Sequence, residues 1–163
     1  MTRAYVGLGA NLGDPATRIG QAFNALAGTE RTTLVARSPV YRSAPLGPPD
    51  QPDYLNAVAA LDTALEPAAL LDALFAIERA AGRDRRAGTR WGPRVLDLDL
   101  LLFGARVASD PKLTLPHPQM HRRDFVLQPL LDLAPDIVIP GRGPAVALLA
   151  ALDERHDLRR VAP

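Results

Sequence analysis

The strongest constraint on the fold is the stretch WGPRVLDLDLLLFG, which spans residues 91–104. Apolar and acidic residues alternate in it up to Asp99, and a purely apolar run follows at residues 100–103. Alternation with a period of two predicts a β-strand with Asp97 and Asp99 on one face and leucines on the other. The apolar run predicts that this strand is central in its sheet and buried on both faces.

Two carboxylates on such a strand destabilise the folded state unless a metal ion, a cation or a proton compensates them. A solvated face of an antiparallel sheet would also accommodate Asp97 and Asp99. The preceding segment favours a metal–phosphate site, because residues 83–94 hold five arginines where about one is expected. Mg²⁺ on the carboxylates and nearby guanidinium groups would together bind a polyphosphate. A solvated run of surface charge is the alternative interpretation of the arginines.

Length and composition predict one domain and exclude several classes of function. The chain has 163 residues, of which 47% are hydrophobic and 23% are charged, so we expect residues 1–163 to form a single domain. The net charge of +1 argues against a partner such as nucleic acid or an anionic membrane. The absence of cysteine excludes disulfides, thiol catalysis and zinc thiolate sites. Neither a signal peptide nor a membrane-spanning run is evident, so we expect a cytoplasmic protein.

Residue patterns predict an ordered series of strands and helices. The expected elements are strands at 3–9, 32–41 (interrupted near Pro39), 54–61 and 95–102, helices at 14–28, 66–82 and 144–152, a hairpin at 104–115, a helical segment that ends at Leu133, and an edge strand at 158–161. The order strand, helix, strand, strand, helix, strand is the split βαβ pattern. It predicts an α+β fold with a ferredoxin-like βαββαβ core and a C-terminal helical tail. In this fold the sheet is mainly antiparallel, with helices packed on one face.

The glycine pattern does not match the common nucleotide-binding loops. Gly7, Gly9 and Gly13 are spaced G-x-G-x-x-x-G, which differs from the Rossmann pattern, and we interpret them as turn glycines. No Walker sequence G-x-x-x-x-G-K-[ST] occurs, so ATP would not be held by such a loop. Residues 43–52, SAPLGPPDQP, contain four prolines and predict a stiff, irregular loop of a length that is often functional.

Four motifs follow one another along most of the chain. They are GLGANLGD, SAPLGPPDQPDYLNAV, GRDRRAGTRWGPRVLDLDLLLFG and LTLPHPQMHRRDFVLQPLLDLAP. The combination WGPR-x-LDLD, followed by LPH and R-x-F, is highly specific. Together the motifs resemble the 6-hydroxymethyl-7,8-dihydropterin pyrophosphokinase family of folate biosynthesis. The resemblance implies a transferase that moves the terminal diphosphate of ATP to the hydroxymethyl group of the pterin and releases AMP, with two Mg²⁺ ions assisting.

The resemblance also implies roles for residues around the nucleotide. Asp97 and Asp99 match the two metal ligands, and their spacing on one strand face suits a two-metal site. The positions that match nucleotide-binding residues are Glu78, Arg83, Arg85, Trp91, Arg94, Lys112, His117 and Arg123. Arg83 and Arg94 are expected to be catalytic together with the two aspartates, because all four would offset or hold charge around the transferred group.

A second set of matches implies a pterin-binding half of the site. Tyr54 and Phe125 match the aromatic residues that sandwich the ring. Asn56 matches the amide that pairs with the donor and acceptor edge of the ring. Taken alone, Tyr54 and Phe125 are typical of core residues. Backbone groups are expected from the start of the proline-rich loop, at Ser43, Ala44 and Leu46.

Three positions depart from the family pattern. Pro118 follows His117 where an aromatic residue is frequent, Phe75 stands where a polar side chain is expected, and the match at Lys112 is loose. These departures concern nucleotide affinity, and they leave the two aspartates intact.

Two other functions stay open on the residues alone. Another Mg²⁺-dependent ATP phosphotransferase would share the aspartate and arginine half of the site, and only Tyr54, Asn56 and Phe125 argue against it. A ferredoxin-like binder of single-stranded nucleic acid would need aromatic platforms and a basic surface, whereas the chain is 5% aromatic. We expect a monomer, and the resemblance implies that its partners are the small molecules ATP and the pterin.

Overall fold

A computed structural model describes residues 1–43, 53–82 and 95–161 of the chain. Within these ranges the main sheet has six strands, which are β1 (Thr2–Ala10), β2 (Thr32–Arg37), β3 (Tyr41–Ser43), β4 (Tyr54–Thr63), β5 (Asp97–Phe103) and β10 (Arg159–Arg160). The helices are α1 (Pro15–Ala27), α2 (Pro67–Ala80), α3 (Asp124–Leu133) and α4 (Ala145–Ala150), with a 3-10 turn at Met120–Arg122. Two small hairpins are formed by β6 (Ala108–Ser109) with β7 (Thr114–Leu115) and by β8 (Val138–Ile139) with β9 (Gly143–Pro144). No helix in the described ranges is long and apolar enough to cross a membrane.

The strand order of the main sheet is β10-β3-β4-β1-β5, and β2 pairs with the second half of β4. Every pairing in this sheet is antiparallel. The predicted interruption near Pro39 is confirmed, because it separates β2 from β3, and these two strands pair with different halves of β4. The edge strand predicted at residues 158–161 is also confirmed, as β10.

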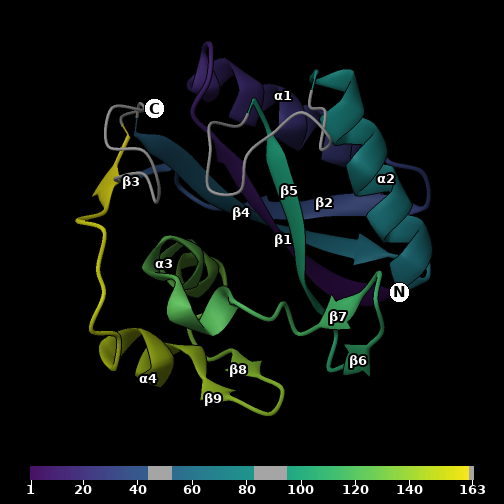
Figure 1. Ribbon diagram of the computed structural model, residues 1–163. Helices are drawn as coiled ribbons and strands as arrows, with labels where there is room; N and C mark the ends of the chain where they lie inside the picture. Colours follow the sequence, from purple (N-terminus) through teal and green to yellow (C-terminus); the bar gives the residue numbers. More distant parts are fainter. Residues whose placement is uncertain (44–52, 83–94, 162–163) are drawn as a thin grey trace.

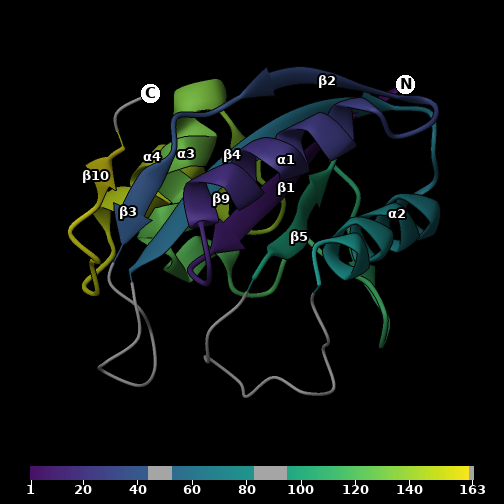
Figure 2. The same cartoon turned by 90° about the horizontal axis from the view of Figure 1, so that it is seen from above.

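Helices cover both faces of the sheet (Figure 1, Figure 2). On one face α1 and α2 bury a cluster that includes Leu8, Leu61, Phe23, Leu74 and Leu98. On the other face α3 buries a second cluster that includes Tyr5, Val58, Leu101, Leu127 and Leu130. The expectation of helices on one face is therefore wrong. The physical reason is that β4 is an almost continuous apolar run, which needs cover on both sides.

Strand β5 lies at the end of the strand order, so the prediction that it is central is also wrong. It is nevertheless buried on both faces at residues 100–103. Leu100 and Phe103 join the cluster under α1 and α2, and Leu101 and Leu102 join the cluster under α3. An edge strand that is covered on both faces has the same apolar sequence as a central strand.

The N-terminal glycines divide between strand and turn. Gly7 and Gly9 lie inside β1, so their interpretation as turn glycines is wrong. Gly13 lies beyond the strand with φ +67, which is a conformation that glycine adopts without strain. The predicted start of α1 is confirmed, because the Asp14 side chain accepts the backbone N–H of Thr17 at 3.3 Å.

Candidate active site

The paired aspartates lie at the start of β5, where the predicted alternation is confirmed. Asp97 and Asp99 are half-buried, whereas Leu96, Leu98 and Leu100 are buried. Leu98 and Leu100 pack toward α1 and α2. The two carboxylates therefore share the opposite face of the sheet, which is the face that α3 covers further along.

The exposed edge of β5 is covered at this point by Glu78 from α2. Glu78 is 2% exposed, and its Oε2 accepts the backbone N–H of Leu98 at 2.7 Å. A buried carboxylate thus satisfies a backbone donor between the two aspartates. The nucleotide-binding role expected for Glu78 stays a prediction, and this contact indicates a role in holding β5.

His117 lies beside the same edge. Its backbone N–H donates to the carbonyl of Leu101 at 2.9 Å, and its Nδ1 accepts the backbone N–H of Gln119 at 3.1 Å. Because Nδ1 acts as an acceptor, the neutral ring carries its proton on Nε2. That nitrogen lies 3.9 Å from Oδ1 of Asp99, so a hydrogen-bond donor stands next to the carboxylate pair.

Burial keeps the His117 imidazole neutral. Burial and, to a smaller extent, the positive charge of Arg123 lower the pKa of His117 from 6.5 to about 4, while Asp97 opposes the change. A neutral imidazole can still donate its Nε2–H to a phosphate oxygen. Because it carries no positive charge, it does not compete with a metal ion for the aspartates. The Arg123 guanidinium carbon also lies 5.8 Å from the ring centre of Phe125, so Arg123 links the His117 side of the site to the start of α3.

The amide of Asn56 has a defined orientation. Its Oδ1 accepts the hydroxyl of Ser43 at 2.9 Å in a buried hydrogen bond, so the amide nitrogen points the other way, toward β1. A Cβ atom placed on Gly9 would lie 3.1 Å from this Nδ2, so glycine leaves the space that the amide needs. Ser43 was expected to contribute backbone groups, and the structure shows its side chain orienting Asn56.

Strand register joins the two halves of the site. Gly9 of β1 is paired with Asn56 on one side and with Asp97 on the other. Residues that pair across neighbouring strands present their side chains on the same face. Two strand spacings separate Asn56 from Asp97, or about 10 Å. Tyr54 lies at the same end of the sheet, paired with Ser43, and Phe125 lies on α3, which packs on β4.

Some predicted residues are not placed at this site. Lys112 lies in the turn between β6 and β7 and is exposed, and this hairpin follows the opposite end of β5 from Asp97 (Figure 1). Six further residues lie outside the described ranges, and their roles stay predictions; they are Ala44, Leu46, Arg83, Arg85, Trp91 and Arg94. The interpretation of Gly9 as a turn glycine misses its role beside Asn56, although a glycine inside a strand signals the close approach of another group.

Asp97 and Asp99 offer the number and kind of ligands that a magnesium ion commonly takes from a protein. Among the described residues, no group of three or more His, Asp or Glu side chains gathers around one point. Mg²⁺ commonly takes one or two carboxylates from the protein and its other oxygen ligands from water and substrate phosphates. Asp97 and Asp99 offer such a partial set of hard oxygen ligands.

Comparison with known proteins decides the family. The family model described as 7,8-dihydro-6-hydroxymethylpterin-pyrophosphokinase matches residues 5–135. The chain belongs to this family. The resemblance that the sequence motifs indicate is therefore confirmed.

Relatives within the family match almost end to end. A Pseudomonas aeruginosa protein named 2-amino-4-hydroxy-6-hydroxymethyldihydropteridine pyrophosphokinase is 54% identical over 149 residues, which cover 91% of each chain. A Haemophilus influenzae protein with the same name is 48% identical over 141 residues, which cover 86% of this chain and 87% of its own.

Solved structures support the fold. A structure of HPPK-DHPS in complex with substrates matches with a TM-score of 0.74 at 11% identity, over 98% of this chain and 46% of that chain. A Plasmodium falciparum HPPK-DHPS structure matches with a TM-score of 0.66 at 12% identity, over 92% of this chain and 43% of that chain. This chain spans less than half the length of these two solved chains, so the likeness shows a shared fold over that part.

Proposed function

We propose that this protein transfers the terminal diphosphate of ATP to the hydroxymethyl group of 6-hydroxymethyl-7,8-dihydropterin in folate biosynthesis. The products are AMP and the pterin diphosphate. The observation that carries the proposal is the family match over residues 5–135, which includes the aspartate pair of β5 and Phe125 of α3. The named relatives, which match about nine-tenths of their own length, support it.

The reaction needs positioning and charge neutralisation more than covalent chemistry. A bond forms between the hydroxymethyl oxygen and the β-phosphorus of ATP, the bond from that phosphorus to the α-phosphate oxygen breaks, and the hydroxyl proton is released. Asp97 and Asp99 would hold two Mg²⁺ ions, which supply positive charge against the phosphate oxygens. His117 would donate its Nε2–H to a phosphate oxygen on the same side. Arg83 and Arg94 complete the proposed phosphate-binding set.

The pterin occupies the other half of the proposed site. Tyr54 and Phe125 stack on its ring, as aromatic residues do with flat heterocycles. Asn56, fixed by Ser43, pairs with the edge of the ring through its amide. The cross-strand row from Asn56 through Gly9 to Asp97 supports a pterin bound on the same sheet face as the metal ligands.

The remaining parts of the proposal concern architecture. We propose a single domain over residues 1–163, with a ferredoxin-like βαββαβ core and a C-terminal helical tail. The strand order β2-β4-β1-β5 and the placement of α1 and α2 on one face support this topology. We further propose that the protein works as a monomer in the cytoplasm.

Product identity tests the proposed function. The protein is incubated with Mg²⁺ and ATP, with and without the pterin, and the nucleotides are separated. AMP should form only with the pterin, and Asp97→Ala should abolish it, whereas the control Asp136→Ala, an exposed carboxylate, should not. ADP as the product would mean transfer of a single phosphoryl group, and the proposal would be wrong. Absence of any pterin-dependent product would also reject it.

A further inference from the structure

A buried carboxylate–imidazole pair ties the C-terminal segment, defined here as residues 153–161, to the start of α3. Asp124 is 3% exposed and His156 is 8% exposed. The backbone N–H of His156 donates to Oδ2 of Asp124 at 2.6 Å, and its ring Nδ1 lies 2.6 Å from Oδ1. Because one carboxylate binds both the backbone and the ring, the orientation of the imidazole is fixed.

The fixed imidazole packs against Phe125. The two ring centres are 5.1 Å apart and the ring planes meet at 86°, which is an edge-to-face arrangement. Phe125 directly follows Asp124 in the chain and is half-buried. The pair therefore acts on the one aromatic residue of α3 to which the proposed function assigns pterin stacking.

A second contact anchors the same segment to β3. Arg160 donates through Nε to the hydroxyl of Tyr41 at 3.2 Å, and this hydroxyl is hydrogen-bonded to Asp132 of α3. Strand β10 pairs with β3, which ends at Ser43, the residue that orients Asn56. The C-terminal segment thus bridges α3 and β3.

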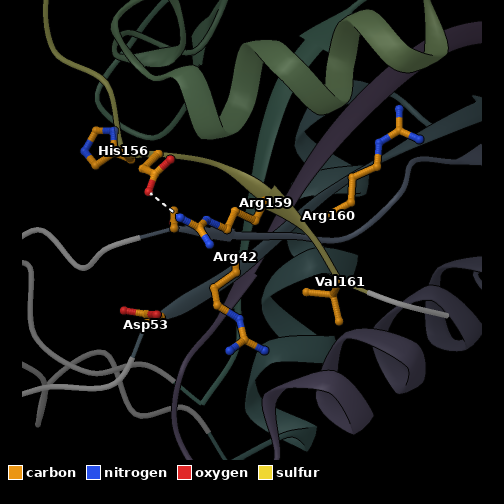
Figure 3. A pocket seen from close by; sticks show the side chains of 8 residues that line it. Arg42, Asp53, His156, Arg159, Arg160 and Val161 are labelled. Carbon is orange, nitrogen blue, oxygen red and sulfur yellow. Dashed lines mark hydrogen bonds and ion pairs between the residues drawn. The ribbon is translucent and has the colours of Figure 1, made fainter.

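The segment also borders a pocket of about 630 Å³. Figure 3 shows this pocket between two parts of the fold. One is the C-terminal segment with His156 and Arg159, and the other is formed by Arg42 of β3 and by Asp53, which precedes β4. Ser43 belongs to the pocket lining. The contacts of His156 and Arg160 therefore lie next to residues of the proposed pterin site.

We propose that Asp124 and His156 are positioning residues for pterin binding, because they hold the Phe125 ring at the angle at which it stacks on the substrate. This inference rests on the proposed function, since it assumes that Phe125 meets the pterin. His156 lies outside residues 5–135, which match the family model. The proposed positioning of Phe125 therefore depends on a part of the chain that the family match does not include.

The direct test is equilibrium binding of 6-hydroxymethylpterin, followed by its fluorescence, with Mg²⁺ and a non-hydrolysable ATP analogue present. His156→Asn keeps a side-chain donor for Asp124 but removes the aromatic ring. We expect its dissociation constant for the pterin to rise roughly three- to tenfold, the range for losing one edge-to-face contact. The dissociation constant for the ATP analogue should not change. The matched control is Asp153→Asn, an exposed carboxylate of the same segment, which should bind both ligands as the wild type does.

A double-mutant cycle separates positioning from a general structural role. Phe125→Leu keeps an apolar side chain but removes the ring on which His156 acts. If His156 works through Phe125, adding His156→Asn to Phe125→Leu should change pterin affinity by less than about twofold. Asp124→Asn, which keeps the shape of the carboxylate and weakens its bonds, should give a smaller rise than His156→Asn, and it carries the test if His156→Asn does not fold.

The outcomes distinguish this inference from the function on which it rests. If the wild type binds no pterin, the proposed function fails. If the wild type binds and Phe125→Leu weakens binding, but His156→Asn and Asp124→Asn bind as the wild type does, the inference alone is wrong. It is also wrong if these variants weaken pterin and nucleotide binding equally, or if the effects of His156→Asn and Phe125→Leu simply add.

Discussion

The Oε2 atom of Glu78 lies 2.7 Å from the backbone nitrogen of Leu98 and accepts its hydrogen bond. Leu98 stands between Asp97 and Asp99, so a buried carboxylate of α2 holds β5 at the point where the proposed metal ligands leave the strand. The position of the aspartate pair therefore depends on a helix that lies on the other face of the sheet.

Removing this contact should affect both stability and activity. Glu78→Ala leaves the Leu98 N–H without its side-chain acceptor, and we expect it to lower the free energy of unfolding by about 1–3 kcal/mol. Because β5 loses a fixed point, kcat/KM should fall as well. Glu78→Gln keeps an acceptor oxygen and should retain more of both. Thermal unfolding and steady-state kinetics measure this, with Asp72→Ala on the exposed side of α2 as control. Wild-type stability and activity in Glu78→Ala would show that the contact is dispensable.

The paired aspartates should be needed for activity and not for folding. Asp97→Asn and Asp99→Asn keep the size and shape of the side chains and remove only their negative charge, so we expect both variants to fold. Activity should fall about a hundredfold or more, because charge on the transferred group is no longer offset. Activity assays and thermal unfolding of both variants check this. A variant that folds and keeps activity near that of the wild type would contradict the proposed metal ligands.

The pH dependence of stability should report the burial of His117. Its pKa is about 4 in the folded chain and 6.5 when unperturbed. As pH falls from 6.5 toward 4, the unfolded chain binds a proton that the folded chain does not, so the contribution of neutral His117 to stability is present above 6.5 and is lost across this window. The free energy of unfolding of the metal-free wild type and of His117→Asn is measured with denaturant at neutral and at mildly acidic pH. The advantage of the wild type should be smaller at the acidic pH. Nitrogen NMR should show the proton on Nε2. Titration of His117 near its ordinary pKa would contradict the expected burial.

Gly9 should be sensitive to a single methyl group. Gly9→Ala places a Cβ atom 3.1 Å from Nδ2 of Asn56, so the amide must shift. We expect the KM for the pterin to rise several-fold while the KM for ATP stays close to that of the wild type. Gly7→Ala is the matched control on the same strand face, because its Cβ meets the Leu101 side chain at an ordinary 3.5 Å. Equal increases in the pterin KM for Gly9→Ala and Gly7→Ala would contradict this expectation, because they would show that the glycines are needed for the packing of β1 and not for the position of Asn56.

Local patterns in the sequence predict the elements of this fold well. The alternation around Asp97 and Asp99 predicts their shared face, and the Asp14–Pro15 pair predicts the start of α1, because both depend on residues close together in the chain. The place of β5 in the sheet is a different matter. The apolar residues of β5 are buried by α2 on one face of the sheet and by the cluster under α3 on the other. A central strand would have the same apolar sequence, so the residues of β5 alone do not reveal its position in the sheet.

The contacts missed by sequence reasoning join distant residues. His156 and Asp124 are 32 positions apart, and neither belongs to a recurring motif that would pair them. Glu78 and Leu98 are 20 positions apart. From the sequence, a charged residue on this helix is as compatible with facing a ligand as with binding the backbone of β5. Such pairs are decided by how α2, α3 and the C-terminal segment pack, which follows from the whole core.

The fate of the β-phosphorus of ATP tests the central claim most directly. The protein is given ATP with a radioactive label on that phosphorus, together with Mg²⁺ and the pterin, and the products are separated. Transfer of a diphosphate at Asp97 and Asp99 predicts that the label moves to the pterin and that the released AMP is unlabelled. Label retained in ADP would contradict the account, because the bond broken would then be the one between the β- and γ-phosphates.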